Sequence, residues 1–177
     1  MIPYPPEMPS GVWSFNPEKG HLKVLDDSLA WPNGIALSSD EKTLYITDTP
    51  LKLGGGIAVD IIQPRLSSFV LWSYHRGIYA FDYDTDISMV SDRRLIYVPD
   101  TYVADGIKIS ENNYIFAATG NTIDVVRASD GILMGKITTG DEIMNNLVAV
   151  PGGEWLFTGQ GGIWRARIAE QGIVNYG

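Results

Sequence analysis

The chain has 177 residues, of which 45% are hydrophobic and 11% aromatic, so it is long and apolar enough to fold around a core. Its formal net charge of −8 and its lack of a basic run argue against nucleic acid and anionic membrane surfaces as partners. The chain contains no cysteine, which excludes disulfides and thiolate metal sites within it.

Clusters of turn-forming residues separate the predicted elements at short intervals. Short clusters of the 19 glycines and 10 prolines, without any sustained 3.6-residue periodicity, favour an all-β fold. Residues 1–6 show neither the charged start nor the apolar run of a signal peptide, and no apolar stretch approaches the ~20 residues of a membrane span, so localisation stays open. The first predicted element is a hairpin of strands Gly11–Phe15 and His21–Leu25.

The next segment, from Trp31 to Thr49, is the pattern that the rest of the chain repeats. Pro32 fixes φ and Gly34 is expected to adopt a positive φ, which would hold Asn33 at a sharp turn. A short apolar strand follows at 35–37, and after a polar turn a second strand is predicted at 43–47. The interpretation is an antiparallel hairpin with an amide side chain at its entry.

The second strand of this hairpin alternates in character. Leu44 and Ile46 are expected on one face, and Tyr45 and Thr47 on the other. Further strands are predicted downstream, at 57–62 within an insertion at 50–66, and then at 68–73, 77–83 and 93–98.

The polar–glycine–strand–turn–strand pattern returns twice. Asp105 with Gly106 opens a second copy, and Asn145 with Asn146 opens a weaker third copy. Asn33, Asp105 and Asn145 are 72 and 40 residues apart, and the insertion accounts for the longer spacing. Strands are predicted in this part of the chain at 107–109, 114–118, 121–127, 132–138, 147–150, 155–158 and 162–168.

Four-stranded units at a period of roughly 40–50 residues are typical of β-propeller blades. A β-sandwich is the alternative, but a sandwich does not require a repeated entry motif. We expect one incomplete propeller domain over 1–177, an arc of blades rather than a closed ring. Its units are a partial blade at 1–30, a blade at 31–100 containing the insertion, a blade at 101–140 and a partial closing blade at 141–177.

Several segments together resemble the SMP-30/gluconolactonase/lactonohydrolase family, in particular its fungal lactonohydrolase-like members. The matching segments are Pro32–Ala36, Leu44–Thr49, Ile78–Asp82, Asp105–Lys108 and Gly162–Arg165. The resemblance runs from about Pro6 to Ile168 and implies the C-terminal half of a six-bladed β-propeller built of four-stranded antiparallel blades.

The resemblance also implies a function and a site. The family hydrolyses small sugar-acid-like lactones, a cleavage of carboxylic ester bonds, with a divalent cation, usually Ca²⁺. By resemblance, Asn33 and Asp105 match metal ligands, and Asp105 also matches the catalytic general base. The family's ligand glutamate has no counterpart here. Since two protein ligands are few for an ion that takes 6–8 oxygens, we expect weak binding at best.

Each of these residues also has a structural interpretation. Asn33 before glycine, and Asp105 before glycine, are common turn formers. For Asn145 and Asn146 there are two interpretations, that one of them lines the central channel of the propeller or that they form a strand-entry turn, and the turn is favoured. The alternative function is a non-catalytic propeller paralogue with a binding or accessory role. The expected partner is a small lactone, with self-association or a partner chain covering the open propeller ends, where sheet faces would otherwise be exposed.

Overall fold

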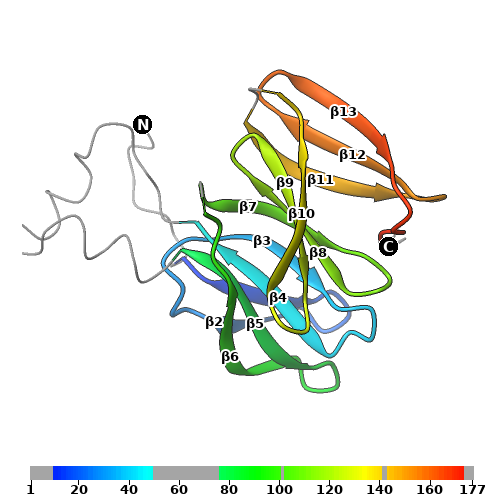
Figure 1. The fold of residues 1–177 in the computed structure, drawn as a ribbon. Helices are drawn as coiled ribbons and strands as arrows, with labels where there is room; N and C mark the ends of the chain where they lie inside the picture. Colours follow the sequence, from blue (N-terminus) through cyan, green and yellow to red (C-terminus); the bar gives the residue numbers. More distant parts are fainter. Residues whose placement is uncertain (1–9, 50–75, 101, 141–142, 174–177) are drawn as a thin grey trace, which may run out of the picture.

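The structure is a computed structural model that describes residues 10–49, 76–100, 102–140 and 143–173. Its strands form antiparallel sheets that are stacked in the order of the chain (Figure 1). The strands are β1 (Val12–Asn16), β2 (His21–Asp26), β3 (Pro32–Leu37), β4 (Thr43–Asp48), β5 (Gly77–Asp84), β6 (Met89–Tyr97), β7 (Ala104–Ile109), β8 (Tyr114–Thr119), β9 (Thr122–Arg127), β10 (Ile132–Thr138), β11 (Met144–Val150), β12 (Glu154–Gly159) and β13 (Gly162–Arg167).

Each sheet is a meander of consecutive strands, as in a propeller blade. Strands β3-β4-β5-β6 and β7-β8-β9-β10 form four-stranded sheets, β11-β12-β13 form a three-stranded sheet, and β1-β2 form a hairpin. The prediction of an all-β fold of four-stranded antiparallel units is confirmed. The expected insertion at 50–66 and the strands at 57–62 and 68–73 lie outside the described residues. Within the described ranges, no helix is long and apolar enough to cross a bilayer.

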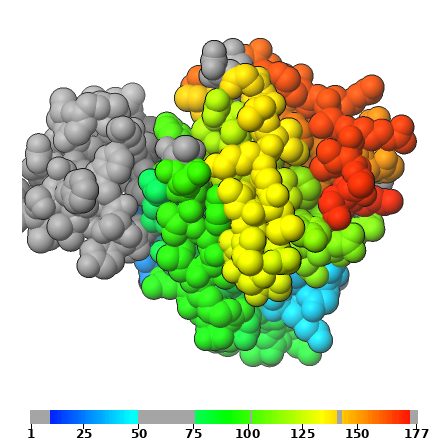
Figure 2. Space-filling model, viewed as in Figure 1, coloured from blue at the N-terminus to red at the C-terminus, as the bar shows by residue number. Residues whose placement is uncertain are grey.

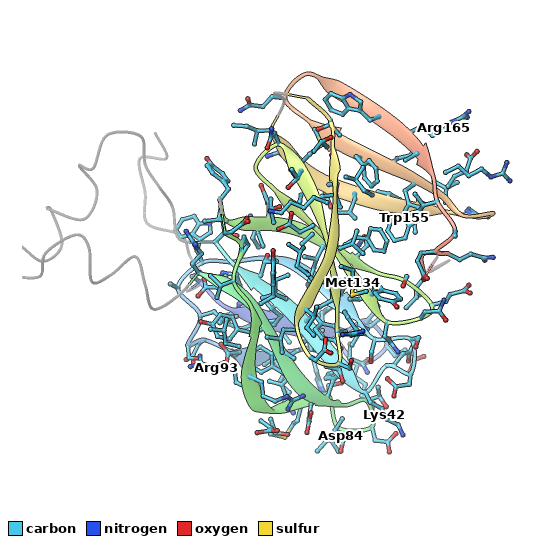
Figure 3. All side chains as sticks on the ribbon, viewed as in Figure 1. Lys42, Asp84, Arg93, Met134, Trp155 and Arg165 are labelled. Carbon is cyan, nitrogen blue, oxygen red and sulfur yellow. The ribbon has the colours of Figure 1, made fainter. Side chains whose placement is uncertain are left out.

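The hydrophobic cores lie between successive sheets, so alternate residues of one strand face different cores. On β4, Leu44 and Ile46 pack into the core shared with the β1-β2 hairpin, whereas Tyr45 packs into the core shared with β7–β10. This is the alternation that the sequence predicts. On β8, Phe116 faces the next sheet, where its ring stacks on that of Trp155, labelled in Figure 3, with the ring centroids 4.2 Å apart.

One buried carboxylate links the two four-stranded sheets. Asp124 on β9 is 0% exposed, and it accepts hydrogen bonds from the Tyr97 hydroxyl on β6 at 2.6 Å and from the Thr122 hydroxyl at 2.9 Å. Lys136 Nζ lies 3.4 Å from Asp124 Oδ1 and 2.6 Å from Asp100 Oδ1. Burial, together with the hydrogen bond to the carboxylate, raises the pKa of Tyr97, so its hydroxyl remains a donor.

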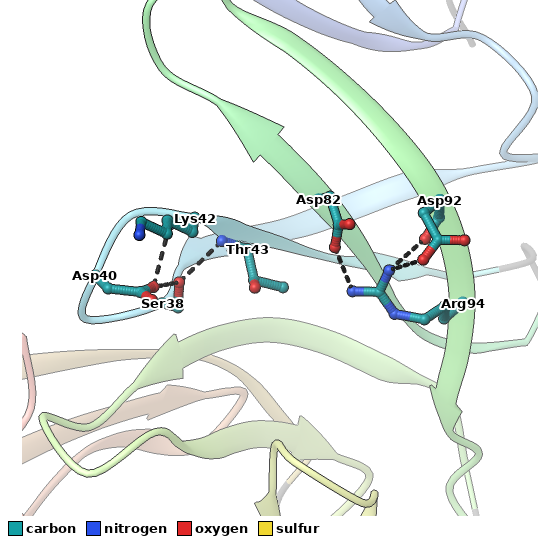
Figure 4. A network of polar contacts seen from close by, with 7 residues as sticks. All are labelled: Ser38, Asp40, Lys42, Thr43, Asp82, Asp92 and Arg94. Carbon is teal, nitrogen blue, oxygen red and sulfur yellow. Dashed lines mark hydrogen bonds and ion pairs between the residues drawn. The ribbon is translucent and has the colours of Figure 1, made fainter.

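Other carboxylates are held in exposed networks on the surface (Figure 4). Side-chain hydrogen bonds close the 38–43 turn between β3 and β4. On the neighbouring strands, Arg94 pairs with Asp82 at 2.7 Å and with Asp92 at 2.6 Å, and both carboxylates are more than half exposed. Exposed pairs of this kind contribute little to stability, because water screens them.

Apolar side chains are exposed on the sheets at both ends of the stack. Phe15, Leu22 and Val24 are exposed on the β1-β2 hairpin, and Ile163 is 73% exposed on β13. Strand β10, the outer strand of its sheet, also lies open on the face seen in Figure 2, where it is yellow. The expectation of self-association, which rests on such surfaces, stays a prediction.

Candidate functional site

The first strands of three successive sheets lie side by side, β3 next to β7 and β7 next to β11 (Figure 1). Each of these strands begins with a shift in register against its neighbour, at 32–35, 104–107 and 144–146. Such bulges redirect side chains at the end of a strand. The polar residues of the three sequence repeats lie within these shifts: Asn33, Asp105 and Asn145.

The expectation of a sharp turn with a positive φ at Gly34 is wrong. Strand β3 already begins at Pro32, and Gly34 is not among the residues with positive φ. A Cβ at Gly34 would instead lie 2.4 Å from the carbonyl oxygen of Asp105 and 2.8 Å from the backbone nitrogen of Ile107. The position requires glycine because the adjacent strand β7 approaches too closely for a side chain.

Strand β7 is in turn closely approached by β11, and the two close approaches bring the polar residues of three sheets together. A Cβ at Gly106 would lie 2.8 Å from the carbonyl oxygen of Asn145. Across the first boundary, Asn33 Nδ2 donates to Asp105 Oδ1 at 2.6 Å. Across the second, Asn145 Nδ2 donates to Asp105 Oδ2 at 3.3 Å. The Asp105 carboxylate therefore lies between two amides that come from the neighbouring sheets.

The structure thus brings the predicted pair together and adds a third residue. Asn33 and Asp105 are in direct contact, and their role as metal ligands stays a prediction. For Asn145 a strand-entry turn was the favoured interpretation, and its side chain contacts the same carboxylate, as the alternative placement in the channel allows. The available signal was the third repeat, which is weak because Asn146 replaces the glycine. The Asn146 side chain instead bonds to its own strand, where its Oδ1 accepts the backbone N–H of Leu147 at 2.8 Å.

Two buried side chains at the end of β4 hold the backbone around the site. The Thr47 hydroxyl accepts the backbone N–H of Gly34 at 2.6 Å and donates to the backbone carbonyl of Asp105 at 2.7 Å. The Asp48 carboxylate accepts the backbone N–H groups of residues 30–31, at 3.0 and 2.5 Å. The entry to β3 is therefore fixed by hydrogen bonds from the strand beside it.

The environment of Asp105 makes its carboxyl harder to ionise than that of an exposed aspartate. Burial raises the pKa of the Asp105 carboxyl above its usual range, while the hydrogen bonds from Asn145 and Asn33 lower it, and burial has the larger effect. A carboxylate of this kind accepts protons more readily than an exposed aspartate. It also carries a negative charge, when ionised, that a bound cation would stabilise.

The donor set fits a hard divalent cation in type but is small in number. Carboxylate and amide oxygens are ligands that Ca²⁺ prefers, and Asp105, Asn33 and Asn145 supply one carboxylate and two amides. Both amides direct nitrogen at the carboxylate here, and half a rotation of each amide would present its oxygen instead. Among the described residues, no group of three or more His, Cys, Asp or Glu side chains could hold a metal ion.

Comparison with known proteins identifies relatives of this chain. A family model described as the SMP-30/gluconolactonase/LRE-like region matches residues 4–68. Lactonohydrolase oryH of Aspergillus oryzae is 34% identical over an alignment with a length of 177 residues, and this alignment covers 92% of this chain. The chain belongs to the SMP-30/gluconolactonase family. It spans 35% of the length of that lactonohydrolase.

Solved structures related to this SMP-30/gluconolactonase chain have the same fold. The gluconolactonase XC5397 of Xanthomonas campestris superimposes with a TM-score of 0.70 at 24% identity, covering 97% of this chain and 48% of that protein. Regucalcin of Agrobacterium tumefaciens, described as a calcium-binding protein, has a TM-score of 0.61 at 15% identity and covers 84% and 43%. At these identities the likeness shows the fold alone, and the described sheets correspond to about half of such a protein.

Proposed function

We propose that Asp105, Asn33 and Asn145 form a divalent cation site, for which Ca²⁺ is the best candidate. We further propose that this site serves the hydrolysis of small sugar-acid-like lactones. The observation that supports the proposal is the contact of one half-buried carboxylate with two amides from neighbouring sheets. The 34% identity to a lactonohydrolase supports the reaction class.

The proposed roles follow from the chemistry of lactone opening. Water adds to the lactone carbonyl carbon, the ring C–O bond breaks, and the ring oxygen takes up a proton to give a hydroxy acid. A bound cation would supply polarisation of the carbonyl group. Asp105 would accept the proton from the attacking water, a role that its raised pKa favours. Asn33 and Asn145 would orient the carboxylate through one oxygen each.

A second candidate is a cation-dependent binding role without catalysis. The small donor set favours it, since three side chains leave most of the 6–8 coordination positions of Ca²⁺ to water. A steady-state assay with gluconolactone separates the two candidates. A rate that requires Ca²⁺ and disappears in Asp105→Asn supports the hydrolase, whereas Ca²⁺ binding without hydrolysis supports the binding role.

Calcium binding by this chain is expected to be weak and to depend on Asp105. We expect a dissociation constant of about 1 mM, the range of sites with few charged ligands. Asp105→Ala should abolish binding because it removes the only charged ligand of the proposed set. Isothermal calorimetry measures both proteins, with Asp82→Ala, an exposed aspartate on β5, as the matched control. A tight site would show that further ligands complete the proposed set, and equal binding by Asp105→Ala and Asp82→Ala would contradict the proposed site.

The same binding should strengthen as pH rises. Because burial raises the pKa of Asp105, its carboxyl remains protonated to a higher pH than an ordinary aspartate, and a protonated carboxyl is a poor cation ligand. Below that pKa, the apparent affinity should fall by up to about tenfold per pH unit. Calcium titrations at about pH 3.5, 5 and 7.5 test this, because the lowest pH lies below the ordinary aspartate pKa of about 3.9. An affinity that does not change across this range would show that Asp105 is not a ligand.

A further inference from the structure

Thr47 is a fully buried side chain that contacts the backbone of Asp105 and of Gly34, the residue next to Asn33. It lies near the end of β4 and is 0% exposed. Its single hydroxyl accepts the N–H of Gly34, the residue after Asn33, and donates to the carbonyl oxygen of Asp105 itself. The hydroxyl therefore ties the backbone of β3 to the backbone of β7 at the two positions that carry the site residues.

We propose that Thr47 is a positioning residue that sets the separation between Asn33 and Asp105. The proposal rests on the proposed cation site for its functional meaning. The Thr47 hydroxyl contacts neither of the two site side chains. All of its hydrogen bonds go to backbone atoms, including a longer one of 3.5 Å to the carbonyl oxygen of Gly34. It acts through the backbone, because a fixed strand separation fixes where the attached side chains can meet.

The next sheet boundary provides an internal comparison. The two sheets share the same register between their first and second strands: Ile35 pairs with Ile46, and Ile107 pairs with Ala117. The residue after Ile46 is Thr47, and the residue after Ala117 is Ala118. Ala118 therefore occupies in β8 the position that Thr47 occupies in β4. Ala118 has no hydroxyl to offer to β11. At the boundary with the hydroxyl, the amide-to-carboxylate contact is 2.6 Å, and at the boundary without it the contact is 3.3 Å.

The close approach of backbones is similar at both boundaries. The boundaries differ in two side chains: the Thr47 hydroxyl is present at the first, and at the second Asn146 replaces the glycine of the approaching strand. A Cβ at Gly34 would lie 2.4 Å from the next strand's carbonyl oxygen, and a Cβ at Gly106 would lie 2.8 Å from the corresponding oxygen of Asn145. At the first boundary that oxygen accepts a hydrogen bond from Thr47. Removing the hydroxyl would leave a buried N–H and a buried carbonyl without this partner, which favours separation of the strands.

The test compares Thr47→Val, which keeps the shape and removes the hydroxyl, with Thr47→Ser, which keeps the hydroxyl. The readouts are the side-chain amide resonances of Asn33 and the hydrogen exchange of the Gly34 N–H, recorded by ¹⁵N NMR on the full chain without metal. We expect Thr47→Val to shift the Asn33 resonances and to raise Gly34 exchange by roughly tenfold or more. Thr47→Ser should restore both. Unchanged Asn33 resonances in Thr47→Val would overturn the proposal.

A gain-of-contact variant keeps the proposal testable if Thr47→Val does not fold. Ala118→Ser adds one hydroxyl at the equivalent buried position and should shift the Asn145 side-chain amide resonances while leaving those of Asn33 in place. The absence of any shift at Asn145 would count against the proposal. Calcium titration of the same samples separates the two hypotheses. If the wild-type chain binds no Ca²⁺ but the NMR changes occur, the positioning role stands and the proposed cation site fails.

Discussion

Gly34→Ala is expected to destabilise the fold by about 3 kcal/mol and to remove the contact between Asn33 and Asp105. The new methyl group would lie 2.4 Å from the Asp105 carbonyl oxygen, a backbone atom that cannot move alone. Strand β7 would have to shift away from β3, which also breaks the hydrogen bonds of Thr47 between them. Urea unfolding followed by tryptophan fluorescence measures the loss.

The matched control for this substitution is Gly135→Ala. Gly135 lies on β10, has no positive φ, and has no atom within 4 Å of the position that its Cβ would occupy. We expect the free energy of unfolding of this variant to lie within about 1 kcal/mol of that of the wild type, because the added methyl group would contact no other atom. Equal stability of the Gly34 and Gly135 variants would show that β3 and β7 are not closely apposed.

Asp124→Ala is expected to cost about 3–5 kcal/mol of unfolding free energy, because it breaks a buried polar group. The substitution removes the acceptor of the part-buried Tyr97 hydroxyl and one of the acceptors of the Thr122 hydroxyl, and it leaves Lys136 without one of its two carboxylates. Removing one member of a buried polar group is costly, since the remaining members stay desolvated.

The comparison for Asp124 uses two further variants. Asp82→Ala removes an exposed ion pair with Arg94 and should cost well under 1 kcal/mol. Tyr97→Phe removes only the hydroxyl that links the two sheets, and we expect a loss of about 1–2 kcal/mol. Denaturant unfolding of all three gives the ranking Asp124, Tyr97, Asp82. A loss for Asp124→Ala as small as that for Asp82→Ala would contradict the role of this carboxylate in joining the sheets.

Much of the fold could be predicted because its determinants are local. Alternation places Leu44 and Ile46 on one face of a strand, and turn clusters separate the strands, so four-stranded units follow from short-range patterns. The expected hairpin at Asn33 is present, but its first strand starts earlier than predicted. A bulge within a strand has no distinct signature in one sequence, and the polar–glycine pair is therefore easily interpreted as a turn.

The site could be predicted only in part because its remaining determinants are contacts between distant residues. The repeat located Asn33 and Asp105, since each stands before a glycine at a strand entry. Asn145 lacks that glycine, and nothing local shows that its amide reaches Asp105. Asp124 alternates with apolar neighbours like any strand residue, and its partner Tyr97 comes from another sheet. Such pairs depend on how the sheets stack, which short-range patterns do not encode.

The meander order of the sheets has a consequence for how the molecule folds. Each described sheet takes all its strands from one contiguous stretch of chain, and packing and hydrogen bonds between successive sheets join the stretches. Pairings close in sequence require little loop closure, so this topology has a lower contact order than a Greek-key arrangement of the same strands. The sheets are therefore natural cooperative units. The most persistent one should be β7–β10, because it packs between β3–β6 and β11–β13, whereas β3–β6 has only the two-stranded β1-β2 hairpin on its other face.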